Sequence, residues 1–290
     1  MPNTSHIPTI IVTGSGGQLG QCVILALRDF EGANILTFGK DELDITDFKA
    51  LERLFQKTNP DYFINCAAYT NVEQAESESD IALLVNATAT EGIASLCVLH
   101  NTVLIFPSTD YVFDGKTKTP YTEHAQPSPL NAYGASKLAG EQAIEAIMTD
   151  YYIIRTSWLY SEFGHNFYNS MVAKFKAGTQ LTITTEQIGT PTNAHDLAAF
   201  IVSLIKNKPE AYGLYHYSNM GEATWYDFAQ AIYDFSSSFK AASLGTTNHY
   251  ATFAARPAYS VLSKDKCIKV FGTTVPHWKE SLKQLMTHHL

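Results

Sequence analysis

Short apolar runs alternate with longer amphipathic stretches through the first half of the chain. The runs are rich in β-branched and aromatic residues and predict buried strands, which we place at 9–13, 34–38, 62–68, 102–108 and 151–157. Between them, apolar residues three and four positions apart predict helices at 18–30, 47–57, 80–100 and 132–148, the second capped by Thr46. Such alternation is typical of a parallel sheet with helices on both faces. The predicted fold class is therefore α/β, with a Rossmann-type doubly wound parallel sheet.

The second half of the chain follows a looser pattern. Helices are expected near 166–177, 195–206 and 225–236, and strands near 181–185 and 214–217. We predict two interleaved units: an NAD(P)-binding Rossmann domain from 1–155 plus about 186–207, and a smaller C-terminal α/β substrate domain from 156–185 and 208–290. The proline-containing segment 111–131 interrupts the alternation, and we expect it to lie on the surface as the edge of a lid.

The composition is that of a compact, folded enzyme. Of the 290 residues, 45% are hydrophobic and 17% are charged, which argues against disorder. The formal net charge of -8 argues against a general binder of nucleic acid or of anionic membranes. No stretch reaches the roughly 18 apolar residues of a membrane span, and the N-terminus lacks a basic signal-peptide segment, so we expect a cytoplasmic protein. The four cysteines form no C-x-x-C pair and are expected to be buried free thiols.

A glycine loop joins the first predicted strand to the first predicted helix. Gly14, Gly17 and Gly20 lie three residues apart in the sequence "TGSGGQLG". Glycines at these places allow a tight turn, a close approach of backbone to a pyrophosphate and close contact between helix and strand. The start of the helix then offers free N–H groups to the phosphates. The loop predicts a dinucleotide-binding site.

The end of the second predicted strand bears on the choice of cofactor. It reads "FGKDELD", in which Gly39 leaves room and Lys40 could meet a 2′-phosphate. Asp41 would repel that phosphate and weakens the inference. We predict NADPH as the cofactor and leave NADH open.

Tyr133 and Lys137 lie four residues apart on a predicted helix and therefore project from the same face. A phenol has a pKa of about 10 and is a poor acid at neutral pH, but a nearby ammonium group favours the phenolate. The tyrosine can then give a proton to a carbonyl oxygen as hydride reaches the carbon. The Thr109 hydroxyl, where an apolar strand ends, would hold the same oxygen in line. Thr109, Tyr133 and Lys137 are the predicted catalytic residues.

These features together resemble the extended short-chain dehydrogenase/reductase family. Further stretches resemble its dTDP-4-dehydrorhamnose reductase branch, among them "ELDITD" (42–47), "NCAAYTNVEQAE" (65–76), "STDYVFDG" (108–115), "RTSWLY" (155–160) and "RPAYSVL" (256–262). The resemblance covers nearly the whole chain. It implies that NAD(P)H reduces the 4-keto group of dTDP-4-dehydro-L-rhamnose, a nucleotide sugar, to give dTDP-L-rhamnose.

The resemblance also assigns site residues. It implies that the cofactor contacts Gly14, Gly17, Gln18 and Leu19 along the pyrophosphate, Lys40, Asp44 and Ile45 near the adenosine, and Ala67, Ala68, Tyr69, Tyr133 and Lys137 towards the nicotinamide. The sugar nucleotide would contact Thr109, Asp110, Tyr111, Trp158, Asn166 and Arg256. Trp158 reads equally well as a core aromatic. Trp225 reads as a packing residue at a helix start, and Thr192 and His195 as turn and helix-start residues.

Two other functions stay open. Dehydratases of the extended family carry Glu after the Thr-Asp pair, whereas Tyr111 follows Asp110 here, so dehydration or epimerisation is the weaker alternative. A non-catalytic regulatory subunit, resembling the beta subunit of methionine adenosyltransferase, would bind a dinucleotide and a partner enzyme without turnover. The predicted helices 80–100 and 132–148 could form a homodimer face. A Mg ion is conceivable by analogy, but the sequence carries no cluster of ligands for a metal.

Overall fold

The computed structural model describes residues 6–28, 30–239, 242–248 and 252–289. Its centre is a six-stranded parallel sheet in the order β10-β5-β4-β3-β1-β2. The strands are β1 (Thr9–Thr13), β2 (Asn34–Phe38), β3 (Tyr62–Asn65), β4 (Val103–Thr109), β5 (Tyr151–Thr156) and β10 (Gly213–His216). The strand order reverses between β1 and β3, and open α/β sheets bind ligands at the carboxyl edge of such a switch point. The sheet confirms the predicted fold class.

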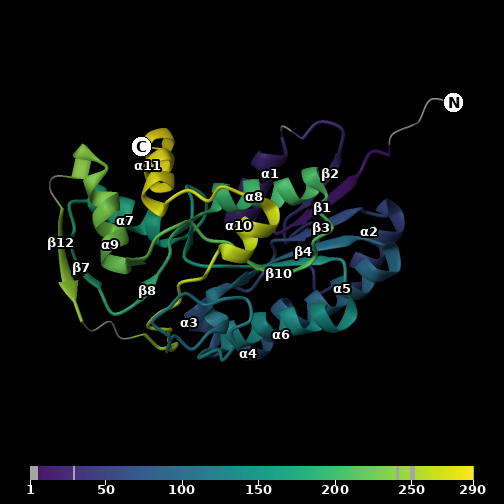
Figure 1. The fold of residues 1–290 in the computed structure, drawn as a ribbon, viewed down its shortest axis with the longest axis horizontal. Coiled ribbons are helices and arrows are strands. Elements are labelled where there is room, and N and C mark those ends of the chain that lie inside the picture. Colours follow the sequence, from purple (N-terminus) through teal and green to yellow (C-terminus); the bar gives the residue numbers. More distant parts are fainter. Residues whose placement is uncertain (1–5, 29, 240–241, 249–251, 290) are drawn as a thin grey trace.

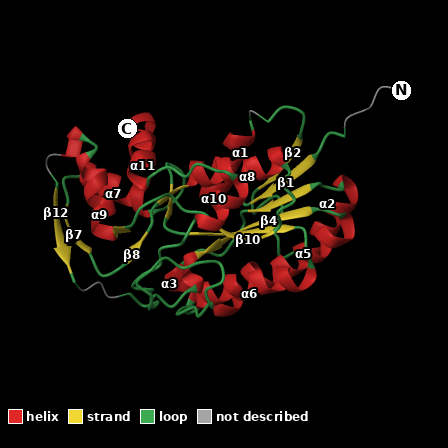
Figure 2. Cartoon of the chain, viewed as in Figure 1, coloured by secondary structure: helices red, strands yellow, loops and turns green. Residues whose placement is uncertain are grey.

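Helices cover both faces of this sheet (Figures 1 and 2). Because successive side chains of a strand point to opposite faces, Ile10 and Val12 pack into one core cluster while Ile11 packs into another. The first cluster contains residues of α1 (Gln18–Leu27), α8 (Ala194–Asn207) and α10 (Asp265–Phe271). The second contains residues of α2 (Phe48–Thr58), α5 (Ala89–His100) and α6 (Ala132–Ile147).

One continuous helical run, Ser79–His100, is long and apolar enough to pass a length-and-hydropathy test for a membrane span. It consists of α4 (Ser79–Leu83), a π-helical turn (Leu84–Thr88) and α5. Half of its most apolar window is buried inside the protein, which is usual for a core helix and makes the test weak evidence. The expectation that no segment spans a membrane therefore stays a prediction.

A second, smaller core lies at the other end of the molecule (Figure 1, left). Three helices build it, α7 (Phe167–Lys176), α9 (Trp225–Asp234) and α11 (Trp278–His289), beside the parallel pair β7 (Gln180–Thr184) and β12 (Ser243–Thr247). Two short pairs connect the parts: β6 (Leu159–Tyr160) with β9 (Thr192–Asn193), and β8 (Ile188–Gly189) with β11 (Ala223–Thr224). Within segment 156–234, α7 and α9 thus belong to the smaller core, whereas α8 packs on the large sheet.

Several details differ from the sequence-based expectations. Strand β10, placed by sequence in the substrate portion, is the edge strand of the large sheet. The side chain of Asp47, not Thr46, caps α2, because its carboxylate accepts from the Ala50 N–H while the Thr46 hydroxyl donates to Asp44. The remaining division into two domains stays a prediction.

The segment 111–131 is not a free lid edge. Its residues Val112, Phe113 and Tyr121 form a buried cluster with Tyr259, Val261 and Leu262. The backbone N–H of Tyr121 donates to the Val261 carbonyl, and that of Ser263 donates to the Tyr121 carbonyl. The apolar residues between the prolines thus fasten this segment to the C-terminal part of the chain.

Candidate active site

The glycine loop between β1 and α1 is built for close packing. Gly14 has φ +67°, and a Cβ there would lie 2.5 Å from the Ala67 nitrogen. A Cβ on Gly20 would lie 2.2 Å from the Gly14 carbonyl oxygen, so the helix rests directly on the turn. Gly17 is the N-cap of α1 and has no side chain with which to cap it. The first N–H groups of α1 are therefore available to an anion, which fits the pyrophosphate of a dinucleotide.

The segment after β3 faces the glycine loop. Ala68 lines the large cavity described below, and Ala67 contacts Gly14. The Tyr69 hydroxyl donates to Glu78 Oε2 at 2.8 Å, and its backbone N–H and carbonyl both bond to Asn86. The predicted cofactor contact of Tyr69 stays a prediction.

Asn86, in the π-helical turn, ties this segment to the helix of Tyr133 and Lys137. Its Oδ1 accepts from the Tyr69 N–H, and its Nδ2 donates to the Tyr69 carbonyl and to Ser136 Oγ, all at 2.9 Å. The Ser136 hydroxyl in turn donates to the Tyr133 carbonyl. π-Helical turns are often found at functional sites. Here the turn places the buried Asn86 amide between the segment of Tyr69 and the helix that carries Tyr133 and Lys137.

The end of β2 carries mixed charges. Lys40 is exposed, and Asp44 accepts two hydrogen bonds from Thr46, which hold the pKa of its carboxyl below the ordinary value. Ile45 is 5% exposed and packs in the core, so only its edge could border an adenine. The Gly39 N–H donates to Glu42 Oε2 at 2.7 Å, which places at this edge a carboxylate that the sequence reasoning did not weigh. Cofactor contacts of Lys40, Asp44 and Ile45 stay predictions.

Thr109 ends β4, and a single 3₁₀ turn, Asp110–Val112, follows it. The Thr109 hydroxyl accepts from the Tyr111 N–H at 3.1 Å and donates to Asp110 Oδ1 at 3.2 Å. Burial raises the pKa of the Asp110 carboxyl to about 7, although hydrogen bonds from Ser260 and Thr109 act in the opposite direction. To hold a substrate carbonyl, the Thr109 hydroxyl has to donate its hydrogen bond to the carbonyl oxygen in place of Asp110 Oδ1.

Tyr133 and Lys137 project from the first turns of α6 beside this turn. Asn131 caps the helix by accepting from the Gly134 N–H at 2.7 Å. The Tyr133 ring meets the Tyr111 ring edge-on, with centroids 6.0 Å apart. Burial raises the pKa of Tyr133 to about 12, and the Thr109 hydroxyl works against that rise. Burial thus outweighs the lowering of the pKa that was expected from the nearby ammonium group, and the phenol is protonated at neutral pH.

Lys137 is 3% exposed. Its ammonium group donates to the Pro107 carbonyl at 2.8 Å and lies 3.8 Å from the centroid of the Phe106 ring. Burial lowers its pKa to about 7, while the Glu141 carboxylate acts to raise it. The ion thus gains one strong hydrogen bond and an aromatic face in exchange for its water.

A cavity of about 510 Å³ brings these groups together. Its walls come from the glycine loop, β3, β4, α6 and the turn after β5, and they include the predicted site residues Gly17, Gln18, Leu19, Ala68, Thr109, Asp110, Tyr111, Tyr133, Lys137, Trp158 and Asn166. Among the described residues, five atoms of the wall residues are buried without a hydrogen-bond partner: Asn65 Nδ2, Ser108 Oγ, Asp110 Oδ2, Thr156 Oγ1 and Tyr160 Oη. Unpaired polar atoms on a cavity wall fit a polar ligand.

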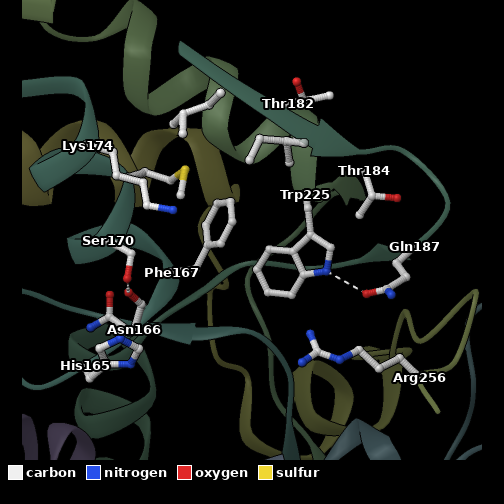
Figure 3. A pocket seen from close by; sticks show the side chains of 13 residues that line it. His165, Asn166, Phe167, Ser170, Lys174, Thr182, Thr184, Gln187, Trp225 and Arg256 are labelled. Atoms are coloured by element: carbon white, nitrogen blue, oxygen red, sulfur yellow. Dashed lines mark hydrogen bonds between the residues drawn. The ribbon is translucent and has the colours of Figure 1, made fainter. Parts of the chain in front are cut away.

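A second cavity of about 460 Å³ adjoins the first, since His165, Asn166, Phe167 and Trp225 line both. Lys174 and Arg256 enter it from opposite sides, with the rings of Phe167 and Trp225 between them (Figure 3). Two cations beside aromatic faces fit a phosphate-bearing ligand with a flat ring. Of the predicted substrate residues, Arg256 lies in this second cavity and Asn166 at the boundary.

Trp158 and Trp225 form the wall between the cavities. Their rings stack with centroids 3.6 Å apart and an interplanar angle of 6°. Trp158 has φ +45°, an uncommon conformation for a large side chain, and a Cβ on Gly189 would collide with its ring. The Trp225 indole donates to Gln187 at 2.8 Å. Trp225, read from sequence as a packing residue, is therefore part of the site.

Gln18 and Asn166 come from opposite ends of the site and meet directly. Asn166 Nδ2 donates to Gln18 Oε1 at 2.6 Å, and Asn166 Oδ1 caps α7 by accepting from the Asn169 N–H. The start of the cofactor-side helix α1 is thereby joined to the start of α7. His165, Phe167, Lys174 and Gln187 were missed altogether, because each is an ordinary helix or loop residue until the two parts meet.

A family model described as the RmlD substrate binding domain matches residues 8–290, nearly the whole chain. The chain belongs to the RmlD family. It is 37% identical over 277 residues to the spore coat polysaccharide biosynthesis protein SpsK of Bacillus subtilis, with 96% of each chain covered. It is 36% identical over 280 residues to a dTDP-4-keto-6-deoxy-D-glucose reductase of Streptomyces niveus, covering 94% of this chain and 95% of that one.

Solved structures agree with this membership of the RmlD family. A crystal structure of dTDP-4-dehydrorhamnose reductase from Bacillus anthracis, in complex with NADP, superposes with a TM-score of 0.90 at 36% identity. The match covers 98% of this chain and all of that one. The Rossmann-like sheet with a smaller C-terminal α/β region is thus the fold of RmlD structures.

Metal binding has no visible support in the side chains of the described residues. Within the described ranges, no group of three His, Cys, Asp or Glu side chains is placed to hold a metal ion. His195, at the start of α8, pairs with Glu162 at 2.8 Å. A Mg ion between two copies of the chain stays untested.

Proposed function

We propose that this chain is a reductase that uses NADPH to convert the 4-keto group of dTDP-4-dehydro-L-rhamnose into the hydroxyl of dTDP-L-rhamnose. One observation carries the proposal: Thr109, Tyr133 and Lys137 line one cavity together with the glycine-loop helix. A dinucleotide held on that helix would extend along the same wall towards the phenol. The NADP in the Bacillus anthracis relative supports the choice of NADPH.

The residues divide the work of carbonyl reduction. The bound cofactor supplies a hydride to the carbonyl carbon. The Tyr133 hydroxyl gives its proton to the carbonyl oxygen, so that an alcohol forms and a phenolate remains. The Thr109 hydroxyl donates to the same oxygen and holds it in line. The Lys137 ammonium group stabilises the phenolate until the tyrosine regains a proton from water.

The two adjoining cavities support a nucleotide-linked substrate. The sugar would occupy the larger cavity near Tyr111 and Trp158, and the diphosphate and base would reach past Trp225 towards Lys174 and Arg256. Guanidinium groups suit phosphate oxygens because their N–H donors form a planar fork. A regulatory subunit without turnover would not require the full set of Thr109, Tyr133 and Lys137 in one cavity, so the enzyme is the better supported of the two.

A substrate panel tests the proposal. The purified protein is mixed with NADPH or NADH and either dTDP-4-dehydro-L-rhamnose or dTDP-4-keto-6-deoxy-D-glucose, and absorbance at the nicotinamide band is followed. We expect stoichiometric consumption of NADPH with the first sugar, and at least tenfold lower kcat/KM with the second, because a misplaced ring substituent misaligns the carbonyl with Tyr133. The Streptomyces niveus relative makes the second sugar the relevant competitor. Faster turnover of that sugar would overturn the rhamnose assignment, and no turnover of either would overturn the reductase.

A further inference from the structure

Glu73 is the centre of a hydrogen-bonded contact between distant parts of the chain. It belongs to the short helix α3 (Val72–Ala75), and its partners lie 180 to 183 residues away. Glu73 Oε2 accepts from the Phe253 N–H at 2.9 Å and from the Ala254 N–H at 3.1 Å. Glu73 Oε1 accepts from Arg256 Nη2 at 2.8 Å. One carboxylate thus fixes both the backbone of 253–254 and the guanidinium that follows it.

The same segment is also fastened to the catalytic helix. Asn131, the N-cap of α6, donates to the Ala255 carbonyl at 2.8 Å. Glu76 Oε1, just after α3, accepts from the Ala132 N–H at 2.7 Å. Residues 253–256 therefore lie between α3 and the first turn of α6. Tyr133 is the second residue of that helix. A shift of residues 253–256 would therefore disturb their contacts with both α3 and α6.

Arg256 is held so that part of its fork stays available. Its side chain is 22% exposed, and Figure 3 shows the guanidinium group pointing into the second cavity towards Trp225. Glu73 occupies one terminal nitrogen, Nη2. Within the described part of the chain, Arg256 Nε is buried and has no hydrogen-bond partner. A buried unpaired donor of this kind is costly unless a ligand completes it.

The charge state of Glu73 suits a residue that orients Arg256. Burial acts to raise its pKa, but the N–H groups of Ala254 and Phe253 and the charge of Arg256 outweigh burial and keep the pKa below the ordinary value. Glu73 is therefore ionised at neutral pH. Since its side chain is 41% exposed, the ion pair by itself contributes little to the stability of the fold. A contact that stabilises little yet orients Arg256 points to a role in binding.

We propose that Glu73 is a positioning residue that sets Arg256 and segment 253–256 to receive the diphosphate of the nucleotide-sugar substrate. The inference rests on the proposed function, because that function supplies the diphosphate. Glu73 does not touch the substrate; it orients the guanidinium through Nη2 and leaves the remaining donors for phosphate oxygens.

The test is a binding measurement that needs no turnover. Isothermal titration of dTDP into the wild type, Glu73→Gln, Arg256→Ala and the double variant gives four dissociation constants. Glu91→Gln, an exposed glutamate on α5, serves as the matched charge control. We expect Glu73→Gln to weaken dTDP about tenfold, Arg256→Ala to weaken it more, and the double variant to equal Arg256→Ala, because a residue that acts through Arg256 adds nothing once Arg256 is gone.

Two further readouts separate positioning from loss of structure. In steady-state turnover, Glu73→Gln should raise the KM for the sugar nucleotide about tenfold and change kcat less than about threefold. The dissociation constant for NADPH and the thermal midpoint should match those of Glu91→Gln. Equal weakening of NADPH and dTDP would indicate a general loosening of the fold and overturn the positioning role.

The outcomes also separate this inference from the proposed function. If the wild type binds dTDP and Glu73→Gln binds it equally well, the positioning role is wrong and the proposed function stands. If the wild type binds none of dTDP, UDP and GDP, the proposed function fails, and the inference fails with it. If the double variant binds dTDP more weakly than Arg256→Ala, Glu73 acts by a route other than Arg256 and the inference is wrong.

Discussion

Replacing Tyr133 with phenylalanine is expected to lower kcat for sugar reduction by about 10²- to 10⁴-fold, the usual contribution of a general acid. The variant loses one oxygen atom and keeps the ring that packs edge-on against Tyr111. The Thr109 hydroxyl, the other group proposed to contact the carbonyl oxygen, donates to Asp110 Oδ1 in the structure. The dissociation constant for NADPH and the thermal midpoint should change little.

The control for Tyr133→Phe is Tyr151→Phe. Tyr151 begins β5 at the end of the sheet opposite the site. The Tyr151→Phe variant also loses one hydroxyl, but away from the site. Its kinetic constants should therefore equal those of the wild type. Tyr133→Phe with wild-type turnover would contradict the assignment of the proton donor.

Replacing Lys137 with methionine is expected to reduce kcat/KM by about 10²-fold or more, because the phenolate formed from Tyr133 loses its neighbouring cation. Methionine keeps an unbranched side chain of similar length without the charge, so the fold should persist. The loss should exceed that in Lys49→Met, an exposed lysine on α2 that serves as the control. Initial rates at saturating sugar and varied NADPH measure it.

The pH profile of the wild type should report the same lysine. Burial lowers the pKa of Lys137 to about 7, so its ammonium form prevails below that pH and is lost as the pH rises. The kcat/KM for NADPH, which reports groups of the free enzyme, should therefore fall on the alkaline side with a midpoint near 7. Tyr133, whose pKa burial raises to about 12, stays protonated throughout and adds no limb below that pH. A flat wild-type profile between about pH 6 and 9, or an unchanged fall in Lys137→Met, would contradict this assignment.

The sequence predicts the parts of the site whose residues lie close together in the chain. The glycine loop, the end of β4 and the Tyr133–Lys137 pair are each a short motif with a fixed spacing, and the parallel sheet brings their ends to one edge. Local spacing was enough because a strand end or a helix face alone decides where such side chains point.

Contacts between distant segments could not be predicted in this way. Glu73 and Arg256 are separated by 183 residues, and Gln18 and Asn166 by 148. Trp225 looks like any aromatic at a helix start until the turn carrying Trp158 is laid against it. Which partners meet depends on how the smaller core packs on the large sheet, and that packing is spread over many weak apolar contacts with no local signature.

The place of β10 in the sheet could not be predicted for a related reason. The sequence predicts a strand near 214–217, but its position beside β5 is determined by pairing across the sheet. The C-terminal residues, for which we predict no helix from the sequence, form α11, where Trp278 and Leu282 are buried and His289 Nδ1 lies 3.1 Å from the Tyr168 hydroxyl. Tertiary packing stabilises a helix whose own sequence gives a weak signal.

The most direct test of the account follows a labelled hydride. NADPH carrying deuterium at C4 of the nicotinamide, on each face in turn, is incubated with the protein and dTDP-4-dehydro-L-rhamnose, and the product is analysed by mass spectrometry and NMR. We expect one labelled face alone to yield dTDP-L-rhamnose with a single deuterium at sugar C4, and Tyr133→Phe to form almost none of it. A product without deuterium at C4, or NADPH oxidation without a reduced sugar, would show that this cavity does not join the cofactor to a 4-keto sugar.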